Sequence, residues 1–316
     1  MNEINVNLNN LNEISTNNNL SANQPLVSII VATYRREITL ERALLSLLNQ
    51  TYDPIEIIIV DDNADEIWNK KVDYIISGFK FKSNRQIRDI RNETNKGSAE
   101  TRNIGIKAAS GEYVTFLDDD DIYLPNKIKN QLEYMIERNS DYCITDLWLY
   151  DESDRLIEKR NRKYIKQNDQ DSLFRYHLMH HLTGTDTMMF KRDYLLRIGG
   201  FPPINIGDEF YLMQKAIEAG GKFSHLSQCD IKAYVHTETA GLSSGESKIK
   251  GENALYEYKK NYFDELSFQH RKYITMRHYA VLAFAEMRRK NYGKFLKYAV
   301  QSFCISPINC VRLLVR

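Results

Sequence analysis

Short apolar runs alternate with helical patterns through the first half of the chain. Residues 26–32, 55–60 and 113–117 are apolar runs rich in β-branched or aromatic side chains, and they predict buried strands. Residues 40–48 repeat their apolar positions at helical spacing, and residues 98–109 form a helical segment bounded by glycines. Such alternation predicts an α/β fold with a mostly parallel sheet flanked by helices.

The remaining elements have weaker patterns. Residues 155–166 are highly charged and are expected to form either an edge strand or an excursion from the sheet. From residue 251 onward only helical periodicity remains, which predicts a helical C-terminal extension. The other expected elements are helices over 64–77, 127–138 and 208–219, and strands over 86–91, 142–148, 187–190 and 231–236.

These patterns divide the chain into three parts. Residues 1–24 are rich in asparagine and carry only two charged side chains, so we expect a disordered lead-in. Residues 25–245 are expected to form one α/β domain with a boundary near residue 140, and residues 246–316 a helical C-terminal region.

Four consecutive aspartates, Asp118 to Asp121, follow the strand predicted over 113–117. Adjacent like charges repel one another, so propensity alone does not explain them. A solvated turn would not need to follow a buried strand, and the spaced oxygens and glycine of an EF-hand loop are missing. Carboxylate oxygens suit Mn²⁺ or Mg²⁺, which often bridge carboxylates to substrate phosphates. The cluster therefore predicts a metal-dependent enzyme that acts on a phosphorylated donor.

Two other predicted strands also end in polar residues. Tyr34 and Arg35 follow the strand that ends at Ala32, and Asp62 follows the strand over 55–60. Ligands of parallel sheets bind outside the carboxyl ends of the strands, so these side chains should converge with the aspartates. Tyr34 offers a face for a nucleobase and Arg35 could pair with phosphate. Asp62 either contacts a base or ribose, or caps the helix that follows.

Asp208 and Glu209 open the helix expected over 208–219. Acidic residues favour the N-terminus of any helix, but one of these carboxylates could also be a general base that deprotonates an acceptor hydroxyl. His236 ends the last predicted strand. It is either a metal ligand, a phosphate contact or a structural histidine.

Composition narrows the function classes and the compartment. The net charge of +1 gives no electrostatic argument for nucleic-acid binding, and the four widely spaced cysteines suggest neither a zinc site nor disulfides. Because no apolar stretch is long enough to span a bilayer and the N-terminus does not resemble a signal peptide, we expect a cytoplasmic protein. No acidic residue follows Glu286, while basic residues do. The C-terminal helices therefore have either a membrane-binding face or an ordinary solvated one.

Four blocks of the chain, in order, resemble the family 2 glycosyltransferases of the GT-A fold. The resemblance is specific over residues 26–138 and looser over 184–244. It implies a Rossmann-like domain in which residues 25–140 bind a nucleotide-sugar and residues 141–245 bind the acceptor. The blocks are residues 27–35, 49–63, 95–105 and 111–121, the last followed by Pro125, with Ile198–Phe201 and Asp208–Glu209 as acceptor-side matches.

The resemblance also implies an activity and a site. The expected enzyme is a metal-dependent inverting glycosyltransferase, which moves a sugar from a UDP-sugar to a glycan or lipid-linked acceptor in surface polysaccharide biosynthesis. Asp118 and Asp120 match the family's Asp-x-Asp motif, and Asp119 is expected near the ribose. The family usually has Glu-Asp where this chain has Asp208-Glu209, and we favour Asp208 as the base. The expected donor-binding residues are Ala32, Tyr34, Arg35, Asp62, Arg102, Asp118 and Asp119; the metal ligands Asp120, Asp118 and His236; and the catalytic residues Asp208 and Glu209.

Two other functions compete with this interpretation. A nucleotidyltransferase on a similar sheet would be expected to have a Gly-rich loop after its first strand, and residues 33–36 contain no glycine. A non-catalytic nucleotide-sugar-binding module could keep the aspartates without needing a base.

Overall fold

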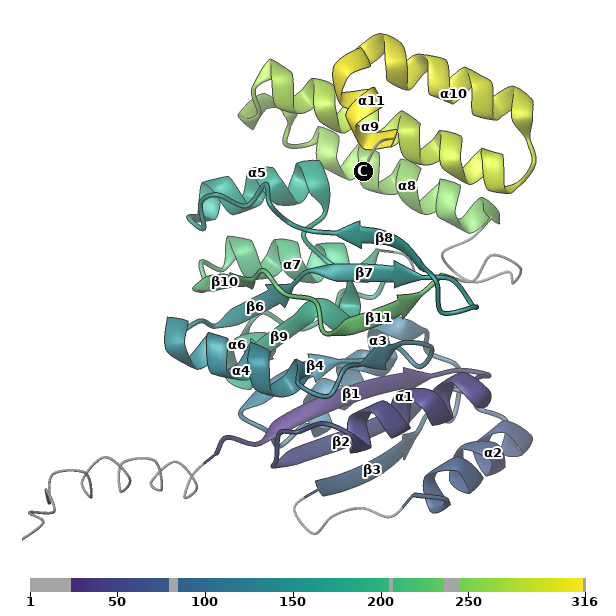
Figure 1. Cartoon of the computed structure of the whole chain (residues 1–316), viewed down its shortest axis with the longest axis vertical. Coiled ribbons are helices and arrows are strands. Elements are labelled where there is room, and N and C mark those ends of the chain that lie inside the picture. Colours follow the sequence, from purple (N-terminus) through teal and green to yellow (C-terminus); the bar gives the residue numbers. More distant parts are fainter. Residues whose placement is uncertain (1–23, 80–84, 205–206, 236–244, 315–316) are drawn as a thin grey trace, which may run out of the picture.

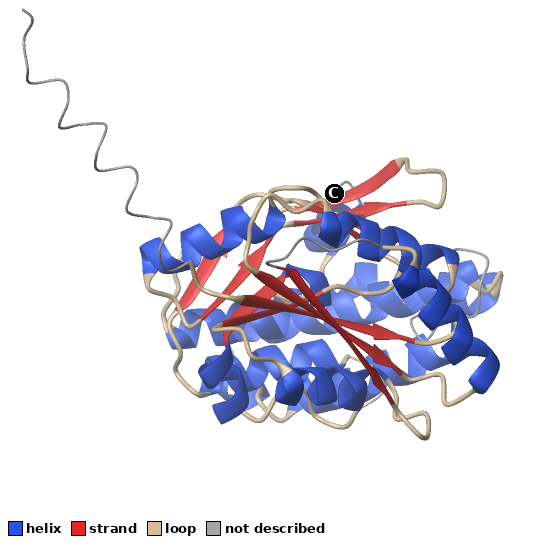
Figure 2. Cartoon of the chain, turned by 90° about the horizontal axis from the view of Figure 1, so that it is seen from below, coloured by secondary structure: helices blue, strands red, loops and turns tan. Residues whose placement is uncertain are grey.

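The structure is a computed structural model, and it describes residues 24–79, 85–204, 207–235 and 245–314. A seven-stranded sheet in the order β10-β6-β9-β4-β1-β2-β3 forms its centre, and helices lie on both sides of these strands (Figures 1 and 2). The strands are β1 (Val27–Thr33), β2 (Ile55–Asp61), β3 (Arg85–Arg91), β4 (Tyr113–Phe116), β6 (Tyr142–Thr145), β9 (Met188–Lys191) and β10 (Phe223–Leu226). The helices that accompany them are α1 (Ile38–Leu48), α2 (Glu66–Ser77), α3 (Ser98–Ala108), α4 (Lys127–Arg138), α6 (Arg192–Arg197) and α7 (Asp208–Glu218).

The α/β prediction is confirmed, with one antiparallel strand inside the sheet. β1 pairs in parallel with β2 and β4, β2 pairs in parallel with β3, and β6 pairs in parallel with β10. β9 lies antiparallel between β4 and β6. Because β9 runs the opposite way, the residues that precede it lie at the edge where β4 ends.

The alternating strand residues build two cores, one on each face of the sheet. In β1, Ile29 packs into a core with Leu44 of α1, whereas its neighbour Ile30 packs into a second core with Ile106 of α3. All four side chains are at most 2% exposed. This double burial explains why the central strands are continuous apolar runs.

A smaller sheet, β5-β11-β7-β8, stands beside the main one. The edge strand expected within 155–166 is confirmed as β8, but the single strand expected over 142–148 is wrong, since β6 and β7 belong to different sheets. The break falls at Asp146, whose carboxylate accepts a hydrogen bond from the Arg162 backbone N–H (3.0 Å) and pairs with His225 (2.8 Å). The strands are β5 (Ile122–Tyr123), β7 (Leu147–Tyr150), β8 (Leu156–Arg160) and β11 (Ile231–Tyr234).

The C-terminal extension is helical, as expected, and it packs on the α/β part. α5 (Gln170–His180) and α7 contact it through a third core, in which Leu178 and Phe210 meet Leu255, Leu266 and Ile274. In the described residues, no helix is both long enough and apolar enough to cross a membrane. The helices of the extension are α8 (Gly245–Lys260), α9 (Phe268–Arg288), α10 (Tyr292–Ile305) and α11 (Pro307–Leu314), with α10 farthest from the sheets (Figure 1).

Candidate active site

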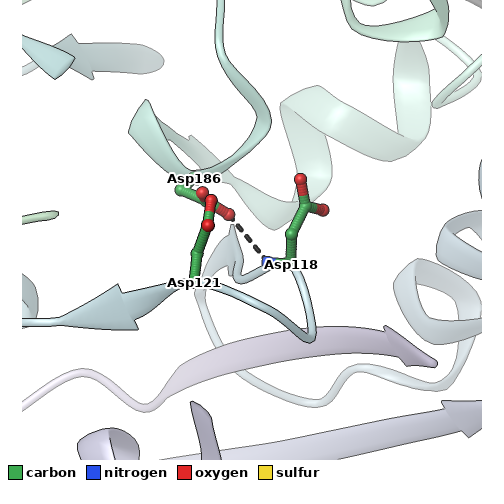
Figure 3. Close-up of side chains that lie close together, drawn as sticks. All are labelled: Asp118, Asp121 and Asp186. Atoms are coloured by element: carbon green, nitrogen blue, oxygen red, sulfur yellow. Dashed lines mark hydrogen bonds between the residues drawn. The ribbon is translucent and has the colours of Figure 1, made fainter. Parts of the chain in front are cut away.

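The end of β4 delivers Asp118 and Asp121 to a cluster that also contains Asp186. Asp186 belongs to the short 3₁₀ turn just before β9, and its Oδ1 accepts a hydrogen bond of 2.7 Å from the Asp118 backbone N–H (Figure 3). The Asp121 carboxylate accepts one of 2.8 Å from the Tyr234 backbone N–H. One carboxylate oxygen from each of the three aspartates lies within 4.8 Å of the others.

The chemistry of this cluster fits a hard cation. Burial, together with the Asp118 charge, raises the pKa of Asp186 to about 7, and burial and Asp186 raise the pKa of Asp121 well above its usual value. The raised pKa values show that the carboxylates repel one another when they are all ionised. A divalent cation bound between them would offset this repulsion and stabilise their ionised forms. Oxygen ligands of this kind suit Mn²⁺ or Mg²⁺.

The other two aspartates of the run face the end of β1. Asp119 Oδ2 accepts hydrogen bonds from the Thr33 hydroxyl (2.8 Å) and the Tyr34 backbone N–H (3.3 Å). Burial and the neighbouring Asp120 raise the pKa of Asp119 to about 7. Asp120 pairs with Arg36 at 3.2 Å. β1 and β4 are neighbours in the sheet, so the expected convergence of their ends is confirmed.

Arg102 of α3 connects the aspartates to the start of α7. Its Nη2 donates to Asp118 (2.6 Å) and its Nη1 to Asp208 (2.9 Å). Burial opposes the charged guanidinium, but the carboxylates of Asp118 and Asp208 outweigh it and raise the pKa of Arg102. One cation therefore joins two parts of the predicted site that lie about 90 residues apart along the chain.

Asp208 and Glu209 have different surroundings at the N-terminus of α7. Asp208 is 5% exposed and already bonded to Arg102, whereas Glu209 is half-buried. Burial and the adjacent Asp208 raise the pKa of Glu209 to about 7. A carboxylate with such a pKa is a competent proton acceptor near neutral pH.

Asp62 binds a loop of the protein itself. Its carboxylate accepts hydrogen bonds from the backbone N–H groups of Lys96 (2.8 Å) and Gly97 (2.9 Å) and from the Asn92 side chain (2.7 Å). Gly97 has a φ of +79°, which a residue with a Cβ rarely adopts. Asp62 thus holds the loop that begins α3, the helix that carries Arg102.

The remaining predicted site residues lie around β1. Tyr34 is 43% exposed, and the Arg35 guanidinium lies 5.2 Å from the centre of its ring. Ala32 is half-buried in β1, next to Val60 in β2. His236 lies outside the described residues.

Sequence reasoning did not identify Asp186 or its support. Beneath it, the buried Lys127 ammonium donates to the hydroxyls of Thr115 (2.7 Å) and Tyr123 (2.8 Å), and the Tyr123 hydroxyl donates to the Asp186 carbonyl (3.0 Å). Burial lowers the pKa of Lys127 to about 7. Asp186 precedes the strand predicted over 187–190. Its position would have placed it beside the end of β4 only if that strand had been known to run antiparallel to β4.

Comparisons with known proteins agree with this geometry. The chain matches the family described as glycosyl transferase family 2 over residues 28–196, more than half of its length. It is 35% identical over 178 residues to an uncharacterized glycosyltransferase of Methanocaldococcus jannaschii, covering 55% of this chain and 59% of that protein. It is 44% identical over 111 residues to UDP-Glc:alpha-D-GlcNAc-diphosphoundecaprenol beta-1,3-glucosyltransferase WfaP of Escherichia coli, covering 35% and 41%. The matches thus span about 60% or less of these curated relatives.

Two solved structures share the fold. TarS 1–349 of S. aureus in complex with UDP-GlcNAc superposes with a TM-score of 0.58 at 19% identity, covering 90% of this chain and 82% of TarS 1–349. Mannosyltransferase PcManGT of Pyrobaculum calidifontis, in complex with GDP-Man and Mn²⁺, gives 0.59 at 16% identity, covering 93% and 79%. The chain belongs to glycosyl transferase family 2 and has a GT-A fold.

Proposed function

We propose that the protein is a metal-dependent inverting glycosyltransferase that moves a sugar from a UDP-sugar to a hydroxyl of a glycan or lipid-linked acceptor. The observation that carries this proposal is the meeting of the strand-end aspartates with Asp208 and Glu209 through Arg102. In a single displacement, the groups that bind the leaving diphosphate and the base that activates the acceptor lie on opposite sides of the transferred sugar. Arg102 connects a candidate for each role, because it bonds to Asp118 among the strand-end aspartates and to Asp208 next to Glu209.

The donor is proposed to bind over the ends of β1 and β4, in the half formed by residues 25–140. Tyr34 is exposed and can stack on the base, with Ala32 and Arg35 beside it. We propose that Asp119 contacts the ribose and that Arg35 pairs with a phosphate. Because the Asp62 carboxylate is occupied by the 92–97 loop, we propose that Asp62 acts on the nucleoside by shaping that loop.

Asp118 and Asp120 are the proposed metal ligands, and His236 stays a third candidate. A bound Mn²⁺ or Mg²⁺ would neutralise the departing diphosphate and make it a better leaving group. Asp186 and Asp121 accept backbone N–H groups, so we propose that they support the loop. The alternative ligand set is Asp118, Asp121 and Asp186.

The acceptor hydroxyl is proposed to give its proton to Glu209, with residues 141–245 forming the acceptor side. The sequence favours Asp208, but its carboxylate already binds Arg102, while Glu209 is more exposed. The hydroxyl oxygen then bonds to the anomeric carbon as the bond to the diphosphate oxygen breaks. The anomeric configuration inverts, and no covalent intermediate is needed.

The names of one relative and one structural neighbour support this choice of donor and acceptor. WfaP is named for UDP-Glc and a diphosphoundecaprenol-linked GlcNAc, and TarS was solved with UDP-GlcNAc. We therefore propose a role in surface polysaccharide biosynthesis, at the cytoplasmic face of the membrane.

A donor screen tests the proposal. Purified protein is incubated with UDP-, GDP- and dTDP-sugars, each with Mn²⁺ or with EDTA, and with a diphospholipid-linked GlcNAc acceptor, and nucleotide release is measured. We expect release from one UDP-sugar that needs both metal and acceptor. If the protein binds UDP tightly but releases nothing from any donor, it is a binding module and the proposal is wrong.

A further inference from the structure

The outermost helix of the C-terminal extension exposes a continuous apolar stripe. Along α10, Tyr292, Leu296, Val300 and Phe303 are 66%, 62%, 52% and 49% exposed. Their spacing of three or four residues puts them on one face of the helix. The opposite face is anchored by Ser302, whose hydroxyl donates to the Met276 carbonyl of α9 (2.9 Å). The stripe therefore points away from the rest of the protein.

Basic side chains surround this stripe. Arg288, Lys290 and Lys297 lie at its start and along its flank, and no ion pair joins them to an acidic residue in the described part of the chain. Glu286, the last acidic residue, is 1% exposed and pairs with Arg289 (3.5 Å). The exposed Glu246 of α8 interacts with Arg289 and Lys294, but basic side chains outnumber it, so the surface around the stripe is net cationic.

A shallow cleft lies at the far end of the stripe. It has a volume of about 520 Å³ and lies between α9 and α10, where Cys304 follows Val300 by one helical turn. Two of its side chains are cations, and the Arg271 Nε is buried without a hydrogen-bond partner among the described residues. The lining residues are Phe268, Arg271, Lys272, Thr275, Cys304 and Ile305.

We propose that the α9–α10 face docks on an anionic membrane, with the apolar stripe in the lipid interface and an acidic headgroup phosphate in the cleft. An amphipathic helix with apolar and basic side chains on one exposed face binds in this way. Arg271, whose Nε has no partner among the described residues, and Lys272 supply the charge-assisted donors that a phosphate accepts.

Charge complementarity selects this occupant over a second copy of the chain. A symmetric dimer through this face would bring its cations against the same cations of the partner. An anionic lipid surface neutralises them instead. This membrane docking deepens the proposed function and rests on it, because a lipid-linked acceptor would lie in the membrane. The docking itself needs no catalysis.

Vesicle sedimentation of the full chain tests the docking without donor or acceptor. We expect binding to phosphatidylcholine vesicles that contain about 30% phosphatidylglycerol, weak binding to pure phosphatidylcholine, and release at about 0.5 M salt, where the Debye length is roughly 4 Å. Arg271→Gln/Lys272→Gln should weaken binding roughly 25-fold, at about five-fold per charge. Leu296→Gln/Phe303→Gln should weaken it at least about 10-fold.

Matched variants on the α/β part separate this face from general effects. Lys107→Gln/Lys129→Gln removes two exposed charges, and Ile67→Gln/Tyr74→Gln removes two exposed apolar side chains, and both should bind like the unchanged protein. Thermal melting checks that all variants fold.

Three results would overturn the inference. The protein could stay in solution with anionic vesicles; the α9–α10 variants could bind as well as the controls; or light scattering could show a dimer that only Leu296→Gln/Phe303→Gln dissociates. Vesicle binding without any sugar transfer would instead contradict only the proposed function.

Discussion

Arg102 is the residue on which the charge balance of the site depends. Its guanidinium bonds to the half-buried Asp118 and the buried Asp208, and so balances part of their negative charge. A bound donor and cation would bring new charges next to Asp118. Arg102 can then hold the Asp208 carboxylate in place, and Glu209, which Arg102 does not bind, is the base that we propose.

The identity of the base can be decided by two isosteric substitutions. Glu209→Gln should lower kcat by about 10²- to 10⁴-fold with UDP affinity nearly unchanged, because a general base acts on the acceptor and not on the nucleotide. With the pKa of Glu209 raised to about 7, kcat should increase as the pH passes through about 7, since only the ionised form accepts a proton. Steady-state kinetics and a pH profile of transfer measure both effects.

Asp208→Asn is the matched control. It removes a charge that Arg102 holds, so it should affect both donor affinity and kcat. It should also move the pH profile to lower pH, because the Asp208 carboxylate contributes to the raised pKa of Glu209. If Glu209→Gln keeps full turnover and Asp208→Asn abolishes it with UDP affinity intact, then Asp208 is the base.

Among the elements, the loop after β4 and the turn before β9 together form the acidic cluster. β9 runs antiparallel to β4, so its first residues meet the last residues of β4 at one edge. Asp186 binds the Asp118 backbone, and Asp121 binds the backbone of Tyr234, the last residue of β11. The acidic run is therefore held from two sides by segments of the second half of the chain.

This arrangement separates what the sequence predicts from what it does not. Local patterns predict the buried runs of β1, β2 and β4. They also predict that the ends of these strands converge, because the carboxyl ends of parallel strands lie at the same edge of the sheet. The role of Asp186 depends on the direction of β9, which is set by packing between β4 and β6 and leaves no local signal. Likewise, the hydrogen bonds that end β6 at Asp146 come from Arg162 and His225, both distant in the sequence.

Asparagine substitutions can distinguish metal ligands from supports within these elements. Asparagine keeps a carbonyl acceptor of the same shape but loses the charge. Asp120→Asn should weaken Mn²⁺-dependent UDP binding by at least about 100-fold. Asp186→Asn should weaken it by at most about 10-fold, because the amide oxygen of the new side chain can still accept from the Asp118 backbone N–H. Calorimetric titration of UDP with and without Mn²⁺ measures both. The reverse order of effects would assign the ion to Asp118, Asp121 and Asp186.

For the whole molecule, the C-terminal helices connect the proposed membrane face to the catalytic part. Phe210 follows Glu209 directly and packs in the third core with Leu255 and Ile274, from α8 and α9. The Lys259 ammonium of α8 lies 5.3 Å from the centre of the Phe210 ring. The first turn of α7 is thus held from behind by the extension.

Loosening this core should therefore change the position of Glu209 at the start of α7. Leu255 is 7% exposed, and Leu255→Ala should lower the free energy of unfolding by about 2–4 kcal/mol because it leaves a cavity. Since the cavity borders Phe210, which follows Glu209, we expect kcat to fall as well. The affinity for UDP should be retained, because the proposed donor site lies at the ends of β1 and β4. Urea denaturation and transfer kinetics measure these effects. Leu296→Ala, at a 62% exposed position of α10, is the control and should change stability by less than about 0.5 kcal/mol. If Leu255→Ala destabilises the protein but leaves kcat unchanged, the extension stabilises the fold without positioning the base.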